Sequence, residues 1–173
     1  MDDLLRQPTR KRIYEVVERH PGASARDIQR IAGLAWGETA YHLDQLTRSG
    51  ALRRERGGRR DYYFRPDMTW EDRRLLRALR SETQRRLLLA LKDRPGRTIA
   101  QLTAECDLSL STTAFHLRGL VGSGLVEGVR DGNSRSYRLA RPERFVDLLR
   151  TYRESFQDRL VDRFVETWSS LIR

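Results

Sequence analysis

The chain has 173 residues, of which 34 are Lys or Arg and 24 are Asp or Glu, so its net charge is +10. No apolar stretch approaches the ~18 residues that a membrane-spanning helix needs, and the first residues lack the pattern of a secretory signal. We therefore expect a cytoplasmic, nucleoid-associated protein that makes no use of a membrane.

The excess positive charge is carried almost entirely by arginine, since only Lys11 and Lys92 are lysines. Such a charge favours an anionic partner and does not by itself choose between nucleic acid and an anionic membrane. The one cysteine, Cys106, and the three scattered histidines show no metal-ligand spacing. We expect no metal and no other cofactor, and we expect Cys106 to be a buried core residue.

An internal repeat organises the chain. Shifting the sequence by 74 residues places 9–66 over 83–140 without a gap, and 15 of the 58 aligned residues are identical. Identical pairs include Pro21-Gly22 with Pro95-Gly96 and His42-Leu43 with His116-Leu117. Two copies are too few for a solenoid, so the repeat predicts two tandem copies of one small domain.

Each copy predicts the same order of elements. A helix over 9–20 stops at Pro-Gly, a second opens at Ser24-x-x-Asp27, and a third spans 37–49 and ends at Ser49-Gly50. Period-two segments at 51–56 and 61–65 flank Gly57-Gly58 and predict a hairpin. Copy two repeats this order, with its third helix over 110–122 and its hairpin over 125–130 and 135–139. Helix, helix, turn, helix and hairpin make a winged helix-turn-helix.

Two further helices lie outside the repeat. A capping box at Thr69-x-x-Asp72 opens a connecting helix to about Arg80, which is expected to run on into copy two because no glycine or proline interrupts 69–93. From Pro142 to Arg173 a helix of about 30 residues, roughly 45 Å long, is expected. Its apolar stripe favours a homodimer, with burial inside one chain as the alternative. The predicted dimerisation residues are Phe145, Leu149, Tyr152, Phe156, Leu160, Phe164, Trp168 and Leu171.

The predicted fold class is mainly α with small β-hairpins (α+β). The predicted domains are a first winged helix-turn-helix at 1–66, a connecting helix at 67–80, a second winged helix-turn-helix at 81–140 and a C-terminal amphipathic helix at 141–173.

The stretch from Leu108 to Leu117, followed by Leu120 and Gly124-Leu125-Val126-Glu127, resembles the recognition region of ArsR-type winged-helix regulators. Copy one is similar but looser, with Ala35-Trp36-Gly37-Glu38 where that family shows small hydroxyl residues. Two such domains in one short chain resemble the tandem winged-helix regulators of archaea. The cysteine pairs with which metal-sensing members bind metal are missing, so the resemblance does not extend to metal sensing.

The predicted DNA-contacting residues lie on the third helices, which can enter the major groove, and on the hairpin wings, which can reach the minor groove or the backbone. On the helices they are Gly37, Glu38, Tyr41, His42, Gln45 and Arg48 in copy one, and Ser111, Thr112, Phe115, His116 and Arg118 in copy two. On the wings they are Arg53, Arg54, Arg56, Arg59 and Arg60 in copy one, and Arg130, Asn133 and Arg135 in copy two. An alternative role for His42 and His116 is to brace the helix against the hairpin.

The resulting hypothesis is a transcriptional regulator that binds double-stranded DNA, with repression as its expected action. A chromatin-like architectural protein with little sequence preference is a second hypothesis, which the acidic residues Glu38 and Asp44 and the arginine wing favour. A winged-helix scaffold for protein interactions is the third. No catalytic motif is present, so an enzyme is not expected.

Overall fold

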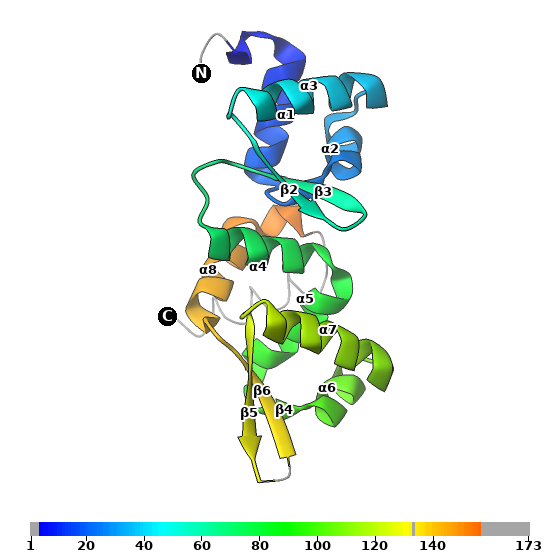
Figure 1. Ribbon diagram of the computed structural model, residues 1–173, viewed down its shortest axis with the longest axis vertical. Helices are drawn as coiled ribbons and strands as arrows, with labels where there is room; N and C mark the ends of the chain where they lie inside the picture. Colours follow the sequence, from blue (N-terminus) through cyan, green and yellow to red (C-terminus); the bar gives the residue numbers. More distant parts are fainter. Residues whose placement is uncertain (1–3, 133, 157–173) are drawn as a thin grey trace. The chain divides into compact units, whose positions relative to one another are not determined.

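The computed structural model describes residues 4–132 and 134–156 (Figure 1). The chain divides into two compact units, Met1–Arg77 and Ala78–Arg173. Both are mainly helical with a small antiparallel sheet, which confirms the predicted fold class. Within the described part of the chain, no helix is long and apolar enough to cross a membrane.

The first unit places a three-helix cluster on a three-stranded sheet of order β1-β3-β2 (Figure 1). A short 3-10 turn, η1, precedes the helices, and α4 follows the sheet. The bounds are η1 Leu4–Arg6, α1 Pro8–Arg19, β1 Ala23–Ser24, α2 Ala25–Ala32, α3 Trp36–Arg48, β2 Arg53–Gly57, β3 Arg60–Phe64 and α4 Trp70–Arg80.

The second unit repeats this arrangement, with a sheet of order β4-β6-β5. A further helix and a 3-10 turn follow the sheet. The bounds are α5 Glu82–Asp93, β4 Arg97–Thr98, α6 Ile99–Glu105, α7 Leu110–Gly122, β5 Val126–Asp131, β6 Ser134–Leu139, α8 Pro142–Thr151 and η2 Arg153–Ser155.

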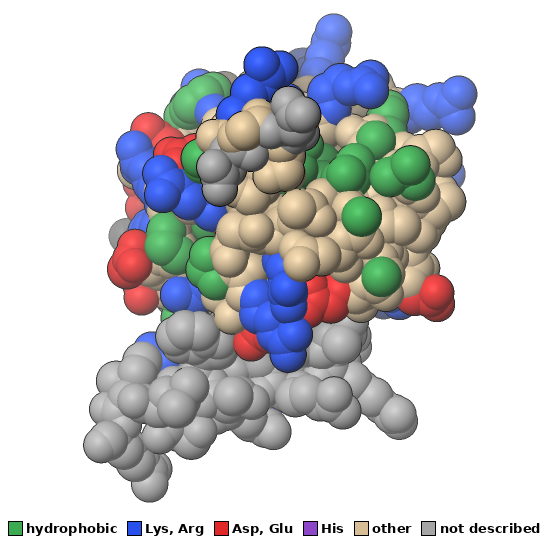
Figure 2. Space-filling view, turned by 90° about the horizontal axis from the view of Figure 1, so that it is seen from below, with side chains coloured by type: hydrophobic (Ala, Val, Ile, Leu, Met, Phe, Trp, Pro, Cys, Tyr) green, Lys and Arg blue, Asp and Glu red, His purple; other side chains and the backbone are tan. Residues whose placement is uncertain are grey.

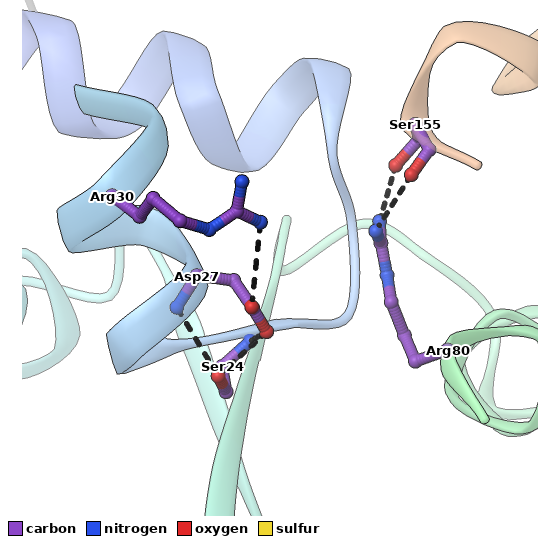
Figure 3. Close-up of polar contacts among 5 residues, drawn as sticks. All are labelled: Ser24, Asp27, Arg30, Arg80 and Ser155. Atoms are coloured by element: carbon purple, nitrogen blue, oxygen red, sulfur yellow. Dashed lines mark hydrogen bonds and ion pairs between the residues drawn. The ribbon is translucent and has the colours of Figure 1, made fainter. Parts of the chain in front are cut away.

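Side-chain caps start the second helix of each unit, as the sequence predicts. Ser24 accepts a hydrogen bond from the Asp27 amide, and the Asp27 carboxylate accepts from the Ser24 amide at 3.2 Å (Figure 3). Thr98 and Gln101 form the same reciprocal pair at α6. These bonds satisfy amides that a helix start would leave without partners, so they fix where α2 and α6 begin.

Apolar side chains from all three helices and the sheet form the core of the first unit. Ile13 and Val17 of α1, Ile28 of α2 and Leu43 and Leu46 of α3 are each 0–1% exposed. In the second unit the equivalent helices bury Leu87, Leu91, Leu102, Leu117 and Leu120. Cys106 is also buried, as predicted, and burial raises the pKa of its thiol.

Each wing is a tight hairpin. Gly57 pairs with Arg60, and Asp131 pairs with Ser134, so both loops have two residues. Both loops begin with a glycine at positive φ, +70° at Gly58 and +57° at Gly132, a conformation that L side chains rarely adopt and that suits a turn matching the twist of the strands.

The third strand of each sheet was missed by the sequence prediction. Ala23 pairs with Tyr63 in the first unit, and Arg97 pairs with Tyr137 in the second. Each strand is two residues long, so it has no periodicity from which to predict it.

The connecting helix does not run on into the second repeat, contrary to expectation. α4 ends at Arg80, and Ser81 caps a new helix, α5, by accepting a hydrogen bond from the Gln84 amide at 3.4 Å. Ser81 is extended (φ −84°, ψ 118°), so a serine cap produces the break without glycine or proline.

The expectation of one continuous helix from Pro142 to Arg173 is also wrong. α8 ends at Thr151, and a 3-10 turn follows. Arg80 donates to the Ser155 carbonyl at 3.1 Å and to its hydroxyl (Figure 3), and its guanidinium lies 4.8 Å from the Phe156 ring centroid. This contact holds the turn within the second unit.

The burial of this segment changes the dimerisation prediction. Phe145, Leu149 and Phe156 are 0–3% exposed within the chain, and Tyr152 is half-buried, so the first part of the predicted stripe is already covered. The predicted contacts Leu160, Phe164, Trp168 and Leu171 lie outside the described residues.

Replacing Leu46 tests the assignment of α3 to the core. Leu46→Ala should lower the free energy of unfolding of the first unit by about 2–5 kcal/mol, because a fully buried leucine leaves a cavity. Tyr41→Ala, on the same helix but 58% exposed, should change it by less than about 0.5 kcal/mol. Urea unfolding followed by circular dichroism measures both, and equal losses for the two variants would contradict the assignment.

Candidate nucleic-acid interface

The third helix of the first unit has one buried face and one exposed face. Thr39, Leu43 and Leu46 are 0–1% exposed, and the Thr39 hydroxyl donates to the Ala35 carbonyl at 2.9 Å. Gly37, Glu38, Tyr41 and Arg48, all predicted to contact DNA, are exposed, and Gln45 is half-buried. The buried threonine and leucines therefore turn these side chains outward.

His42 does not belong to the exposed face, so its predicted outward position is wrong. Its side chain is 6% exposed, its Nε2 lies 3.4 Å from Gln7 Nε2, and its ring meets the Tyr41 ring edge-on at 5.1 Å. Burial lowers the pKa of His42, and the nearby Arg10 adds to that effect. The alternative prediction places this histidine between the helix and the hairpin, whereas the contacts found are with Gln7, ahead of α1, and with Tyr41.

The two acidic residues of this helix have partners. Glu38 accepts a hydrogen bond from the Thr9 hydroxyl at 3.0 Å, and Asp44 forms an ion pair with Arg48 at 2.9 Å. Both contacts lie at the surface, where an ion pair contributes little to stability. The ion pair does offset the negative charge of Asp44, which would otherwise face an anionic partner, and it occupies Arg48.

The third helix of the second unit presents a more neutral face. Thr113, Leu117 and Leu120 are buried, whereas Ser111, Phe115 and Arg118 are exposed. The Ser109 hydroxyl caps the helix by accepting from the Thr112 amide at 3.1 Å. In the first unit Ala35 stands at this place and gives no side-chain cap.

Thr112 and His116 are half-buried rather than fully outward. The His116 ring meets the Phe115 ring edge-on at 5.2 Å, and its buried Nδ1 has no hydrogen-bond partner within the described residues. Phe115 is 69% exposed, so each unit pairs an outward aromatic ring with an inward-leaning histidine.

The first wing carries arginines on both faces. Arg53, Arg54, Arg56, Arg59 and Arg60 are all exposed, as predicted. Strand alternation places Arg54 and Arg56 opposite Tyr63 and Asp61, on the face where Tyr63 joins the core. Arg54 Nε lies 3.9 Å from the Asp61 carboxylate.

The opposite face of the first wing is covered by α4. Arg73 is 5% exposed and forms a buried ion pair with Glu55, and it also donates to the Met68 carbonyl. The Arg77 guanidinium lies 4.8 Å from the Tyr62 ring centroid. α4 thus braces the hairpin from one side, while the arginines at its tip stay exposed.

The second wing exposes Arg130 and Arg135, which lie directly opposite each other across the strands. Asn133, the third residue predicted on this wing, lies outside the described residues.

Sequence reasoning missed several exposed apolar residues beside these faces. Trp36 is 43% exposed at the start of α3, and the Arg26 guanidinium lies 4.2 Å from its ring centroid. Leu110 and Val129 are exposed in the second unit, and Figure 2 shows exposed hydrophobic side chains near basic ones on one face. One sequence signal could have pointed to Trp36: Ala35-Trp36 stands where the ArsR-type regulators show small hydroxyl residues.

In the part of the chain that the structure describes, no group of three or more His, Cys, Asp or Glu side chains could hold a metal ion.

Family models match both units. Residues 7–76 match a model described as an N-terminal HTH domain, and residues 73–129 match one described as a helix-turn-helix domain. The chain carries two helix-turn-helix domains. The matches do not name the ArsR type, so that resemblance stays a prediction.

A Methanocaldococcus jannaschii protein named as an uncharacterized HTH-type transcriptional regulator is 25% identical over 132 residues. The match covers 76% of this chain and 33% of the relative, so the chain spans about a third of its length. The crystal structure of the DIP2311 protein from Corynebacterium diphtheriae matches with a TM-score of 0.30 and 17% identity, over 76% of this chain and 26% of that one. A similarity at that level does not bear on function.

The buried His42 should make the first helix-turn-helix domain sensitive to acid. Because its pKa is lowered on folding, the unfolded chain binds the proton more readily, so stability is complete above the ordinary pKa of 6.5 and falls as the pH drops below it. Urea unfolding at pH 7.5 and pH 5.5 should show a smaller loss for His42→Gln than for the unaltered chain. An equal loss would contradict the burial of the histidine.

Proposed function

We propose that the chain is a transcription regulator that binds double-stranded DNA through both helix-turn-helix domains. The observation that carries the proposal is the two-faced third helix of each domain, which buries a threonine and two leucines and turns an exposed aromatic and polar face outward. A helix of this kind fits the major groove, where hydrogen bonds and apolar contacts read base edges. The helix-turn-helix matches and the regulator relative support the same function.

The two domains contribute unequally in this proposal. In the first, the arginines at the tip of the wing, Arg56, Arg59 and Arg60, contact the minor groove or the phosphates, while the reading helix is partly acidic. In the second, α7 carries no acidic residue, and Ser111 and Phe115 are placed to contact bases, Phe115 against a thymine methyl group.

Repression is the regulatory action we propose, since a protein bound across a promoter excludes polymerase without further chemistry.

Homodimerisation also stays a prediction. Its predicted contacts no longer include Phe145, Leu149 and Phe156, because these residues are buried within the chain. Sedimentation equilibrium of the full chain measures it directly.

Sequence specificity separates a regulator from an architectural protein. Selection of bound duplexes from a random DNA pool, followed by affinity measurements at matched salt, should yield a site bound at least about 10³-fold more tightly than random duplex. A ratio near one would favour the architectural protein, which the arginine wing also suits. Absence of binding to any duplex at about 50 mM salt would leave the protein-interaction scaffold.

The wing is tested by Arg56→Ala, Arg59→Ala and Arg60→Ala combined in one variant. Each phosphate contact that is lost should make the slope of log affinity against log salt less negative by about 0.9, and affinity should fall across all sequences. The matched control removes Arg19, Arg94 and Arg138, each of which pairs with a carboxylate at the surface. Fluorescence anisotropy with labelled duplex measures both, and an unchanged slope in the wing variant would show the wing assignment to be wrong.

A further inference from the structure

A cavity of about 250 Å³ opens in the second unit between the reading helix α7 and the wing strand β6. Its apolar wall consists of Ile99, Ala114, Leu117 and Val121. Arg118, Arg135 and Tyr137 supply its polar groups. The volume is close to the lower end of small-molecule sites, which span roughly 300–1,000 Å³.

The equivalent place in the first unit carries different charged residues. Shifting by 74 residues brings Asp44, Asp61 and Tyr63 onto the three polar residues of the cavity. There the Arg54 guanidinium lies 3.9 Å from Asp61. Burial raises the pKa of Tyr63, as do the charges of Asp61 and Asp44, whereas Arg54 opposes them.

Three substitutions distinguish the two copies. Gly128 stands where Arg54 stands in the first unit, Arg118 replaces Asp44, and Arg135 replaces Asp61. The first unit therefore holds two acids and a cation, Arg54, at these three positions. In the second unit cations replace both acids, and the Arg135 guanidinium lies against Gly128, where a Cβ would come within 3.0 Å of it.

Positive charge is concentrated at this site without an acidic partner. Among the described residues, neither Arg118 nor Arg135 forms an ion pair, and Arg135 lies with its guanidinium 5.6 Å from the Tyr137 ring centroid. Arg130 lies directly opposite Arg135 on the same face, where the first unit pairs Arg56 with Asp61. Like charges facing each other across strands are unfavourable, so the site is suited to a bound anion.

We propose that this cavity binds the carboxylate of a small apolar acid, with the carboxylate between Arg118 and Arg135 and the hydrocarbon against Leu117 and Val121. Guanidinium groups bind carboxylates in a two-pronged geometry, and the apolar wall distinguishes such an acid from a phosphate group.

The position of the cavity implies a consequence for DNA binding, which rests on the proposed function. Arg118 of the reading helix and Arg135 of the wing are both predicted to contact DNA. A carboxylate that neutralises them removes cations available for phosphates, so the bound acid should lower DNA affinity, and DNA should lower affinity for the acid equally.

The ligand class is tested on the full chain without DNA, by calorimetry and by the NMR spectra of labelled Leu and Val methyl groups. Benzoate and isovalerate should bind with a dissociation constant of about 1 mM or lower and shift the Leu117 and Val121 methyl signals. Benzamide, which lacks the charge, and inorganic phosphate, which lacks the apolar body, should bind at least about tenfold more weakly. Equal binding of phosphate would overturn the proposal in favour of a phosphate contact, and no methyl shift with either acid at about 10 mM would overturn it outright.

A variant that rebuilds the first unit's arrangement tests the residues. Arg118→Asp, Gly128→Arg and Arg135→Asp together should fold, because the first unit holds the same set, and should lose acid binding at least tenfold. Arg138→Gln, which loses only the surface pair with Glu127, is the control and should bind normally. Should the triple variant melt early, Arg118→Gln with Arg135→Gln is measured instead. Unchanged binding in a folded variant would overturn the assignment.

DNA affinity is measured last, by anisotropy with and without benzoate. The link to DNA is supported if benzoate lowers the DNA affinity of the unaltered chain but not that of the triple variant. Acid binding with unchanged DNA affinity would overturn that link, and failure to bind DNA at all would be a failure of the proposed function, separate from the result without DNA.

Discussion

The burial of one stripe of each third helix is the constraint on which the rest of the structure depends. Thr39, Leu43 and Leu46 in the first unit, and their counterparts in the second, are at most 2% exposed. Once they pack onto the other two helices, the rotation of the helix about its own axis is set, because side chains follow a period of 3.6 residues. The composition of the outward face, and every proposal about DNA, follows from that rotation.

Much of the fold could be predicted from the sequence because it is determined locally. Capping residues such as Ser24 and Thr98 bond to amides three residues away, and the turn glycines Gly58 and Gly132 adopt conformations that other residues disfavour. The internal repeat strengthened these predictions, because each element was seen twice.

Two of the wrong predictions involve contacts between residues distant in sequence. His42 lies at the edge of the buried stripe, and its inward position involves Gln7, 35 residues earlier. α8 ends at Thr151 although no glycine or proline follows in the sequence, and Arg80 holds the next turn through Ser155, 75 residues away. The cavity of the second unit could not be predicted from the aligned repeats, because Ile99, Leu117 and Arg135 come together only when the helices pack against the strand.

The brace behind the first wing affects more than stability. Arg73 and Glu55 form a buried ion pair, and Arg77 covers Tyr62, so α4 restricts the motion of the hairpin from one side. A flexible arm must give up conformational entropy when it is immobilised on a partner, and that loss weakens binding. The first wing has already lost much of this freedom on folding. In the proposed complex its arginines therefore need to order their side chains only, which leaves more of their attraction to phosphate available as affinity.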